Sequence, residues 1–274
     1  MLKPLPLWRH RPAILQRCTT HEWCALCLDY DGTLTPIVAD PAAAHLSPTL
    51  RQVLAALACH PRYCVAIVSG RALADVQARV AGLGLYLAGN HGLEIAGPGI
   101  AYCHPQAVQL RPQLATLAQA LQHGLQGVPG AWVEDKGFTL TVHMRHVPAA
   151  DVPTVQHRVR RLVQGSPEAW RLTLRTGKAV VEVRPAVSWD KGAAVRWLLE
   201  QWQRDRPAQR GYPVYMGDDE TDEDVFRALG ATGVGIVVDG ERQHSAARYA
   251  VESPAQVVQF LAVLQALVWP ARRG

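Results

Sequence analysis

The sequence lacks the long apolar run that a membrane-spanning helix requires. None of its windows holds about eighteen consecutive apolar residues, the shortest stretch expected to cross a bilayer as a helix. Near the start, Pro4, Pro6 and Arg9 interrupt the apolar residues, so a secretory signal is not expected. The sequence therefore predicts a cytoplasmic protein that does not associate with a membrane.

Cysteine pairs with the spacing of a zinc site are nearly absent. Among the six cysteines, only Cys24 and Cys27 form a C-x-x-C pattern. Both lie in a predicted strand, where an odd spacing directs the two side chains to opposite faces. Such a pair suits neither a metal nor a disulfide, so we expect reduced, partly buried thiols.

A concentrated basic patch is also missing, although the chain carries a net charge of +5. The basic residues are spread out, with small clusters at 158–161 and 272–273. Aromatic residues are not interleaved with them as in an RNA-binding surface. We therefore expect no nucleic-acid partner, and solvated helix faces account for most of the charge.

Apolar residues make up 49% of the 274 residues, which is enough for a large core. Short apolar runs at 24–28, 63–68 and 85–88 alternate with helical stripes, and a similar alternation resumes from 189 to 267. Strands that alternate with helices form parallel βαβ units. The predicted fold class is α/β, with a Rossmann-like, doubly wound parallel sheet as the core.

The pattern changes in the middle of the chain to helix, two strands, helix and two strands. Apolar and polar residues alternate from 138 to 145, as in a sheet with one buried face. This predicts a smaller α+β cap domain inserted into the core at 106–185. The core then comprises 23–105 and 186–274, and 1–22 form an N-terminal arm.

Two carboxylates follow the first predicted strand. Asp29 and Asp31 are two residues apart, so their side chains point to the same side of an extended backbone. Like charges at one place repel unless a cation or a shared proton lies between them. The same D-x-D-G pattern also occurs in simple turns, so this pair alone does not establish a site.

Further polar residues stand at the ends of other predicted elements. Ser69 follows a strand, Lys191 begins a helix, and Asp218 with Asp219 and Asp222 follows another strand. In open α/β sheets, ligands bind outside the carboxyl ends of the strands. Carboxylate ligands favour Mg²⁺ over zinc, and a phosphoryl group requires neutralisation by metal and lysine. The nearby Glu220, Glu223 and Asp224 are expected only to complement a helix dipole.

These residues resemble the four motifs of the haloacid dehalogenase superfamily of phosphohydrolases. The motifs here are Asp29–Tyr30–Asp31–Gly32–Thr33, Ser69, Lys191 and 217–222. More narrowly, the chain resembles the trehalose-6-phosphate phosphatases. The segments that carry this likeness are 28–36, 69–71, 88–94, 177–185, 190–192 and 217–224.

The resemblance implies a role for each core motif residue. Asp29 attacks phosphorus and forms an aspartyl-phosphate. Asp31 protonates the leaving sugar oxygen and then takes a proton from water. Mg²⁺ is held by the Asp29 carboxylate, the Asp31 backbone carbonyl and Asp218, with Asp219 or Asp222 behind them. The phosphate oxygens are bound by Ser69 and Lys191.

The resemblance also implies that the cap contacts the sugar, through Glu134, Lys136 and Glu182. An alternating strand places Lys178 on the face of Glu182, which makes it a further candidate. In the core, the additional candidates for contact with the substrate are Arg71, Asn90 and His91.

The predicted activity is the Mg²⁺-dependent hydrolysis of trehalose 6-phosphate to trehalose and phosphate, as in trehalose biosynthesis. The partner is thus a small molecule, a phosphorylated disaccharide, and the oligomeric state is left open. One alternative is a phosphatase of sucrose 6-phosphate or of glucosyl- or mannosyl-phosphoglycerate. Another is a non-catalytic, regulatory module that binds a sugar phosphate.

Overall fold

The computed structural model describes residues 3–38, 40–177 and 179–269. The chain divides into two compact units: one comprises Met1–Tyr102 and Trp189–Gly274, and the other Cys103–Ser188. The predicted cap at 106–185 lies within the second unit. Among the described residues, no helix is long and apolar enough to cross a membrane.

Strand β2 (Trp23–Leu28) lies in the middle of the main sheet, and all six of its residues are buried. It pairs in parallel with β11 on one side and with β3 on the other. The sheet is parallel from β1 to β4, and β4 pairs antiparallel with β5. Its nine strands, in spatial order, are β1 (Leu5–Pro6), β13 (Tyr249–Val251), β12 (Val234–Val238), β11 (Gly211–Gly217), β2, β3 (Tyr63–Val68), β4 (Tyr86–Gly89), β5 (Glu94–Gly97) and β6 (Ile100–Cys103).

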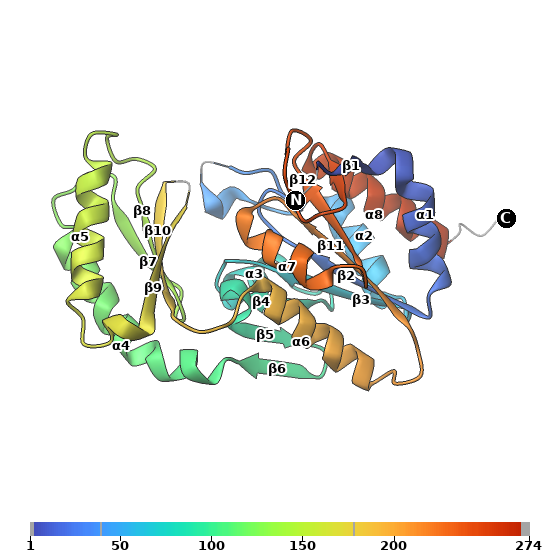
Figure 1. Ribbon diagram of the computed structural model, residues 1–274, viewed down its shortest axis with the longest axis horizontal. Coiled ribbons are helices and arrows are strands. Elements are labelled where there is room, and N and C mark those ends of the chain that lie inside the picture. Colours follow the sequence, from blue (N-terminus) through green and yellow to red (C-terminus); the bar gives the residue numbers. More distant parts are fainter. Residues whose placement is uncertain (1–2, 39, 178, 270–274) are drawn as a thin grey trace. The chain divides into compact units, whose positions relative to one another are not determined.

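Helices cover both faces of this sheet (Figure 1). Cys24 belongs to the core beneath one set of helices and Cys27 to the core beneath the other, so the predicted opposite orientation is confirmed. Both are buried free thiols. The doubly wound α/β class is likewise confirmed. The first face is covered by α1 (Leu7–Thr20), α2 (Pro48–Cys59), α3 (Leu73–Arg79) and α8 (Pro254–Val268), and the second by α6 (Lys191–Arg204) and α7 (Glu223–Leu229).

Within the segment predicted to be an N-terminal arm, 1–22, the described residues from Leu5 onward pack on the core. Strand β1 extends the main sheet, and α1 buries Leu7, Ile14 and Cys18. Pro12 and the basic residues around it interrupt the apolar stripe, which is why the sequence pattern does not indicate this helix. Contacts of α1 with α8 and β13 supply the apolar surroundings that the local sequence cannot show.

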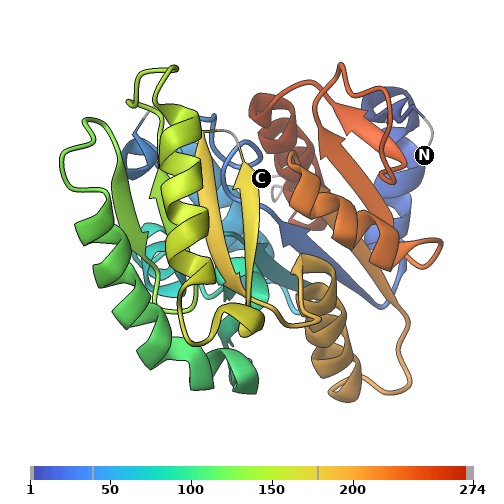
Figure 2. The same cartoon turned by 60° about the vertical axis from the view of Figure 1, so that its left-hand side comes forward.

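The second unit has the predicted α+β composition. Helices α4 (Pro105–Gly124) and α5 (Val152–Gln164) pack side by side on one face of a four-stranded antiparallel sheet (Figure 2). The strands, in order, are β7 (Trp132–Asp135), β8 (Leu140–His143), β10 (Val180–Pro185) and β9 (Leu172–Gly177). Short 3-10 helices occur at η1 (Pro41–Ala43), η2 (Asn90–Gly92), η3 (Ala169–Arg171) and η4 (Glu220–Asp222).

Candidate active site

The carboxyl ends of neighbouring parallel strands bring the core motif residues to one edge of the main sheet. Asp29 follows β2, Ser69 follows β3, and Asp218 follows β11. The backbone N–H of Asp29 donates to the Met216 carbonyl at 2.8 Å, so strand pairing continues into the site. The sheet thus positions the backbone at these residues, and each side chain starts from a fixed place.

Lys191 lies in the first turn of α6, which Asp190 caps by accepting a hydrogen bond from the Ala193 N–H. Its ammonium donates to Asp29 Oδ1 at 2.7 Å and to Asp222 Oδ1 at 2.8 Å, and all three side chains are buried. Burial by itself would lower the pKa of Lys191, but Asp222 and Asp29 outweigh this and raise it. Lys191 therefore carries its positive charge within the site.

Asp222, rather than Asp219, is tied into this cluster. Its side chain also accepts hydrogen bonds from the Tyr215 hydroxyl at 2.6 Å and from the Asp219 N–H at 2.9 Å. Asp219 is exposed, and its carboxylate caps η4. The predicted supporting role thus fits the geometry of Asp222, while Asp219 acts on the local backbone.

The carboxylate of Asp218 packs against the loop that follows Asp31. A Cβ atom on Gly32 would lie 2.1 Å from Asp218 Oδ2, and the φ of this glycine is +79°. Only glycine satisfies both demands, because other residues are strained at positive φ and would collide with the carboxylate. Arg242 holds the other side of Asp218 by donating to its backbone carbonyl at 2.6 Å.

Three carboxylates converge closely enough to hold a metal ion. Oxygen atoms of Asp29, Asp218 and Asp222 lie within 4.8 Å of one another. Burial raises the pKa of Asp218 to about 6, with Asp222 adding to the rise and Lys191 opposing it. Among the described residues, Lys191 is the basic residue that forms ion pairs with this cluster. The excess of negative charge and the hard oxygen donors fit a divalent cation.

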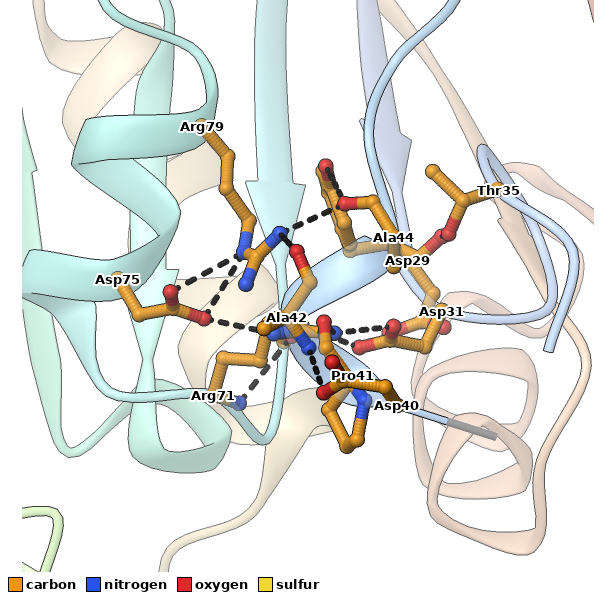
Figure 3. Close-up of polar contacts among 12 residues, drawn as sticks. Asp29, Asp31, Thr35, Asp40, Pro41, Ala42, Ala44, Arg71, Asp75 and Arg79 are labelled. Atoms are coloured by element: carbon orange, nitrogen blue, oxygen red, sulfur yellow. Dashed lines mark hydrogen bonds and ion pairs between the residues drawn. The ribbon is translucent and has the colours of Figure 1, made fainter. Parts of the chain in front are cut away.

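Asp31 makes a different contact from Asp29. Arg71 grips its carboxylate at two points, from Nε to Oδ2 at 2.6 Å and from Nη2 to Oδ1 at 2.7 Å (Figure 3). The Arg71 guanidinium also bonds Asp75 through Nη1 at 2.7 Å. Burial alone would lower the pKa of Arg71, but Asp31 and Asp75 outweigh it and raise the pKa. Whether the Asp31 carbonyl binds a metal stays a prediction.

Asn90 and His91 shape the turn after β4. Both have left-handed φ angles, 49° and 57°. Their N–H groups donate to the carbonyls of Arg71 and Ser69, at 2.7 and 2.9 Å. The fully buried Asn90 amide also donates to Glu94 at 2.6 Å. These contacts support the loop that carries Ser69 and Arg71, and direct contact with a substrate stays a prediction.

In the second unit, the predicted cap residues share the sheet face that the helices leave uncovered. Glu134 and Glu182 are both in register with Thr141 of β8, so the three side chains point to the same side. Glu182 Oε1 lies 3.8 Å from Lys136 Nζ, and Glu134 Oε2 lies 2.8 Å from His143 Nε2. Lys178 lies outside the described residues.

Several contributors lack an obvious signal in the sequence. Tyr215 lies inside an apolar strand and Arg242 in a loop, so their contacts with the acidic cluster follow only from the fold. Glu223, expected to be a helix-dipole charge, is buried and accepts hydrogen bonds from Ser245 and Ala246. That expectation is wrong, because the loop before β13 folds back over α7. The spacing of Asp75 and Arg79 is a detectable exception, since i, i+4 pairs of opposite charge meet on a helix.

Comparisons with known proteins show what this chain is similar to. The model of the trehalose-phosphatase family matches residues 27–255. An uncharacterized glycosyl hydrolase of Mycobacterium tuberculosis is 44% identical over 260 residues, which are 91% of this chain and 19% of that protein. The trehalose-phosphate phosphatase of Mycobacterium marinum is 41% identical over 86% of this chain and 60% of its own length. The chain thus spans less than two thirds of these relatives.

Solved structures show the same fold. The C-terminal domain of Candida albicans trehalose-6-phosphate phosphatase superposes with a TM-score of 0.80 at 24% identity, covering 97% of this chain and 98% of that one. A haloacid dehalogenase-like hydrolase from Bacteroides thetaiotaomicron gives a TM-score of 0.59 at 15% identity, covering 88% and 99%. The parallel sheet with an inserted antiparallel unit is therefore a haloacid dehalogenase-like fold.

Proposed function

Because the chain belongs to the trehalose-phosphatase family, we propose that it hydrolyses trehalose 6-phosphate to trehalose and phosphate. The observation that carries this proposal is the buried cluster in which Lys191 bonds Asp29 and Asp222 beside Asp218. A carboxylate nucleophile, an ammonium and further oxygen ligands are what an enzyme needs to transfer a phosphoryl group. A buried lysine that served packing alone would not require three acids around it.

Mg²⁺ is the proposed ion at the carboxylate cluster, where Asp29 and Asp218 would hold it with support from Asp222. Hard oxygen ligands are the donors that Mg²⁺ prefers. When bound, the ion neutralises charge on the phosphoryl oxygens. The Arg242 bond to the Asp218 carbonyl and the close approach of Gly32 keep the Asp218 ligand in place.

The reaction divides into two halves. In the first, an Asp29 oxygen bonds to phosphorus as the bond from phosphorus to the sugar oxygen breaks, and that oxygen takes a proton from Asp31. In the second, a water oxygen bonds to phosphorus, its proton passes to Asp31, and the bond from Asp29 to phosphorus breaks. Lys191 and Ser69 hold the phosphoryl oxygens. Burial raises the pKa of Asp29, and the bond from Lys191 opposes that rise and so favours the ionised form that attacks.

The cap supplies the proposed sugar contacts. Glu134, Lys136 and Glu182 present charged groups on one sheet face, and Arg184 braces Glu182 from 2.5 Å. A disaccharide offers many hydroxyl groups and little apolar area, so charged and polar partners suit it. Cytoplasmic location and the absence of nucleic-acid and membrane partners remain part of this proposal.

A panel of sugar phosphates tests the proposed substrate. The purified protein with Mg²⁺ should release phosphate fastest from trehalose 6-phosphate, compared with sucrose 6-phosphate and with glucosyl- and mannosyl-phosphoglycerate. Equal or faster phosphate release from one of the other esters would contradict the proposed substrate and leave the proposed phosphatase activity in place. Binding of trehalose 6-phosphate without any phosphate release would favour a regulatory module.

We expect Mg²⁺ to stabilise the protein more at pH 7.5 than at pH 5. The pKa of Asp218 is about 6 in the folded metal-free protein, against 3.8 as its ordinary value. The folded state therefore binds more protons than the unfolded state between these values, and stability falls as pH rises through this window. Above it the carboxylate is ionised and free to bind the ion. Saturating Mg²⁺ should then raise Tm by about 5 °C at pH 7.5.

The control for this prediction is Asp218→Asn, which keeps the shape of the side chain and removes its charge. In this variant the Tm shift with Mg²⁺ should be lost at both pH values. A shift of the same size at pH 5 and pH 7.5 in the unsubstituted protein would contradict the expected competition between proton and metal.

A further inference from the structure

The guanidinium of Arg71 is committed to protein groups. Nε and Nη2 bond the Asp31 carboxylate, Nη2 also bonds the Pro41 carbonyl at 2.9 Å, and Nη1 bonds Asp75 (Figure 3). All three nitrogens therefore already donate to an acceptor. The side chain is only 12% exposed, so it is built into the loop as a structural part.

Other residues hold Arg71 in this position. Asp75 forms ion pairs with both Arg71 and Arg79. Burial by itself would raise the pKa of Asp75, but the bonds to the two arginines outweigh it and lower the pKa. Arg79 in turn bonds the carbonyl of Ala44 at 2.7 Å. The ring of Tyr30 lies beneath both guanidinium groups, at 5.4 and 6.0 Å from their central carbons.

This arrangement connects the loop after β2 to helix α3 and ends at the Asp31 carboxylate. A two-point grip fixes the orientation of a carboxylate as well as its location, which a single hydrogen bond does not do. When Asp31 carries a proton, one oxygen still accepts from the guanidinium while the other presents the proton. Arg71 thus stays bonded to Asp31 through both halves of the reaction, at two points when the carboxylate is ionised and at one oxygen or more when it carries the proton.

We propose that Arg71 is a positioning residue: it orients the Asp31 carboxyl group for proton transfer to the leaving oxygen and does not bind the phosphoryl group. The inference rests on the proposed phosphatase function and replaces the expected contact of Arg71 with the substrate. In the step concerned, the bond from phosphorus to the leaving oxygen breaks, its electron pair stays on that oxygen, and the proton comes from Asp31.

The dependence of the rate on the leaving group separates the two roles. A sugar alkoxide is a poor leaving group and needs the Asp31 proton, whereas p-nitrophenolate leaves without one. Both substrates carry the same phosphoryl group. We therefore compare single-turnover release of trehalose from trehalose 6-phosphate and of p-nitrophenolate from p-nitrophenyl phosphate, with enzyme in excess.

Arg71→Ala should slow trehalose release about 10²-fold, as expected when an acid is misplaced, and slow p-nitrophenolate release by less than about fivefold. Arg71→Lys keeps the charge without the two-point grip and should fall in between. The result is a ratio measured on one protein sample, so partial unfolding of a variant does not imitate it.

Arg79→Ala is the matched control. It removes an arginine from the same network and the same tyrosine ring, but Arg79 bonds Asp75 and backbone carbonyls, not Asp31. Arg71 keeps its own bonds to Asp31, the Pro41 carbonyl and Asp75 in this variant, so the ratio of the two rates should stay as in the unsubstituted protein. A loss of stability in this variant without a change in the ratio identifies the purely structural effect.

Equal slowing of both substrates by Arg71→Ala would overturn the inference, because it would place Arg71 on the phosphoryl group. No slowing of either would overturn it as well. If the substrate panel selects another sugar phosphate, the same comparison is made with that ester, so a wrong substrate and a wrong role for Arg71 give different results. A protein inactive on every ester would overturn both proposals.

Discussion

Replacement of Asp29 by asparagine is expected to lower kcat by about 10⁴-fold or more while the protein remains folded. The amide has the size of the carboxylate but is no nucleophile, so the aspartyl-phosphate cannot form. Lys191 keeps its bond to Asp222, which preserves the arrangement around α6. Phosphate release under saturating substrate measures the loss, and thermal unfolding shows that the fold persists.

A matched acid provides the control for Asp29. Glu220 is exposed and belongs to the same acidic segment that follows β11, yet it complements only the local helix end. Glu220→Gln should therefore change kcat by less than about threefold, as expected for a surface position. More than a tenth of the original activity in Asp29→Asn would show that a different group attacks phosphorus.

Replacement of Lys191 by methionine is expected to affect both activity and stability. Methionine fills the volume of the lysine stem but leaves Asp29 and Asp222 buried without their cation. Breaking a buried ion pair by removing one partner costs about 3–5 kcal/mol. Loss of a charged donor to the phosphoryl group should reduce kcat by about 10²–10³-fold. Chemical unfolding and steady-state kinetics measure the two effects separately.

The stability loss in Lys191→Met should depend on pH in a defined direction. Burial already raises the pKa of Asp29, and without the opposing ammonium of Lys191 this pKa rises further above its value in the unfolded chain. The folded state then binds the extra protons, and the loss grows as pH rises from about 5 to 8. The unfolding free energies of Lys191→Met and of the unsubstituted protein, measured without metal, should differ more at pH 8 than at pH 5.

A double variant tests the cause. Lys191→Met combined with Asp222→Asn removes one of the two stranded charges, so it should recover part of the stability of Lys191→Met and none of its activity. A loss of stability in Lys191→Met that is the same at both pH values would attribute the effect to packing, not to unpaired charge.

The residues of the candidate metal site and of the candidate sugar site could both be predicted from sequence patterns. The acid pair at 29 and 31, Ser69 and Asp218 stand at strand ends, and strand ends are recognisable from short apolar runs. Their meeting at one sheet edge follows because parallel strands end on the same side. The face shared by Glu134 and Glu182 likewise follows from the period of a strand.

The partner of each charged group did not follow from such patterns. The sequence predicts Arg71 only as a candidate for contact with the substrate, whereas its guanidinium bonds Asp31, forty positions earlier in the chain. Sequence patterns make Asp219 and Asp222 equal candidates for supporting the metal. The hydrogen bonds from Tyr215 and Lys191 to Asp222 distinguish the two. Both distinctions depend on side chains from separate elements, whose approach no local period describes.

The sequence by itself determined the class of the fold, the inserted unit and the set of residues at the strand ends, because periodicity and turn chemistry are properties of a few neighbouring residues. Only the tertiary structure decided that the helix at Leu7–Thr20 packs on the core and which cation meets which carboxylate. Those outcomes depend on burial and on contacts between segments far apart in the chain. They appear only when the helices and strands have packed against one another.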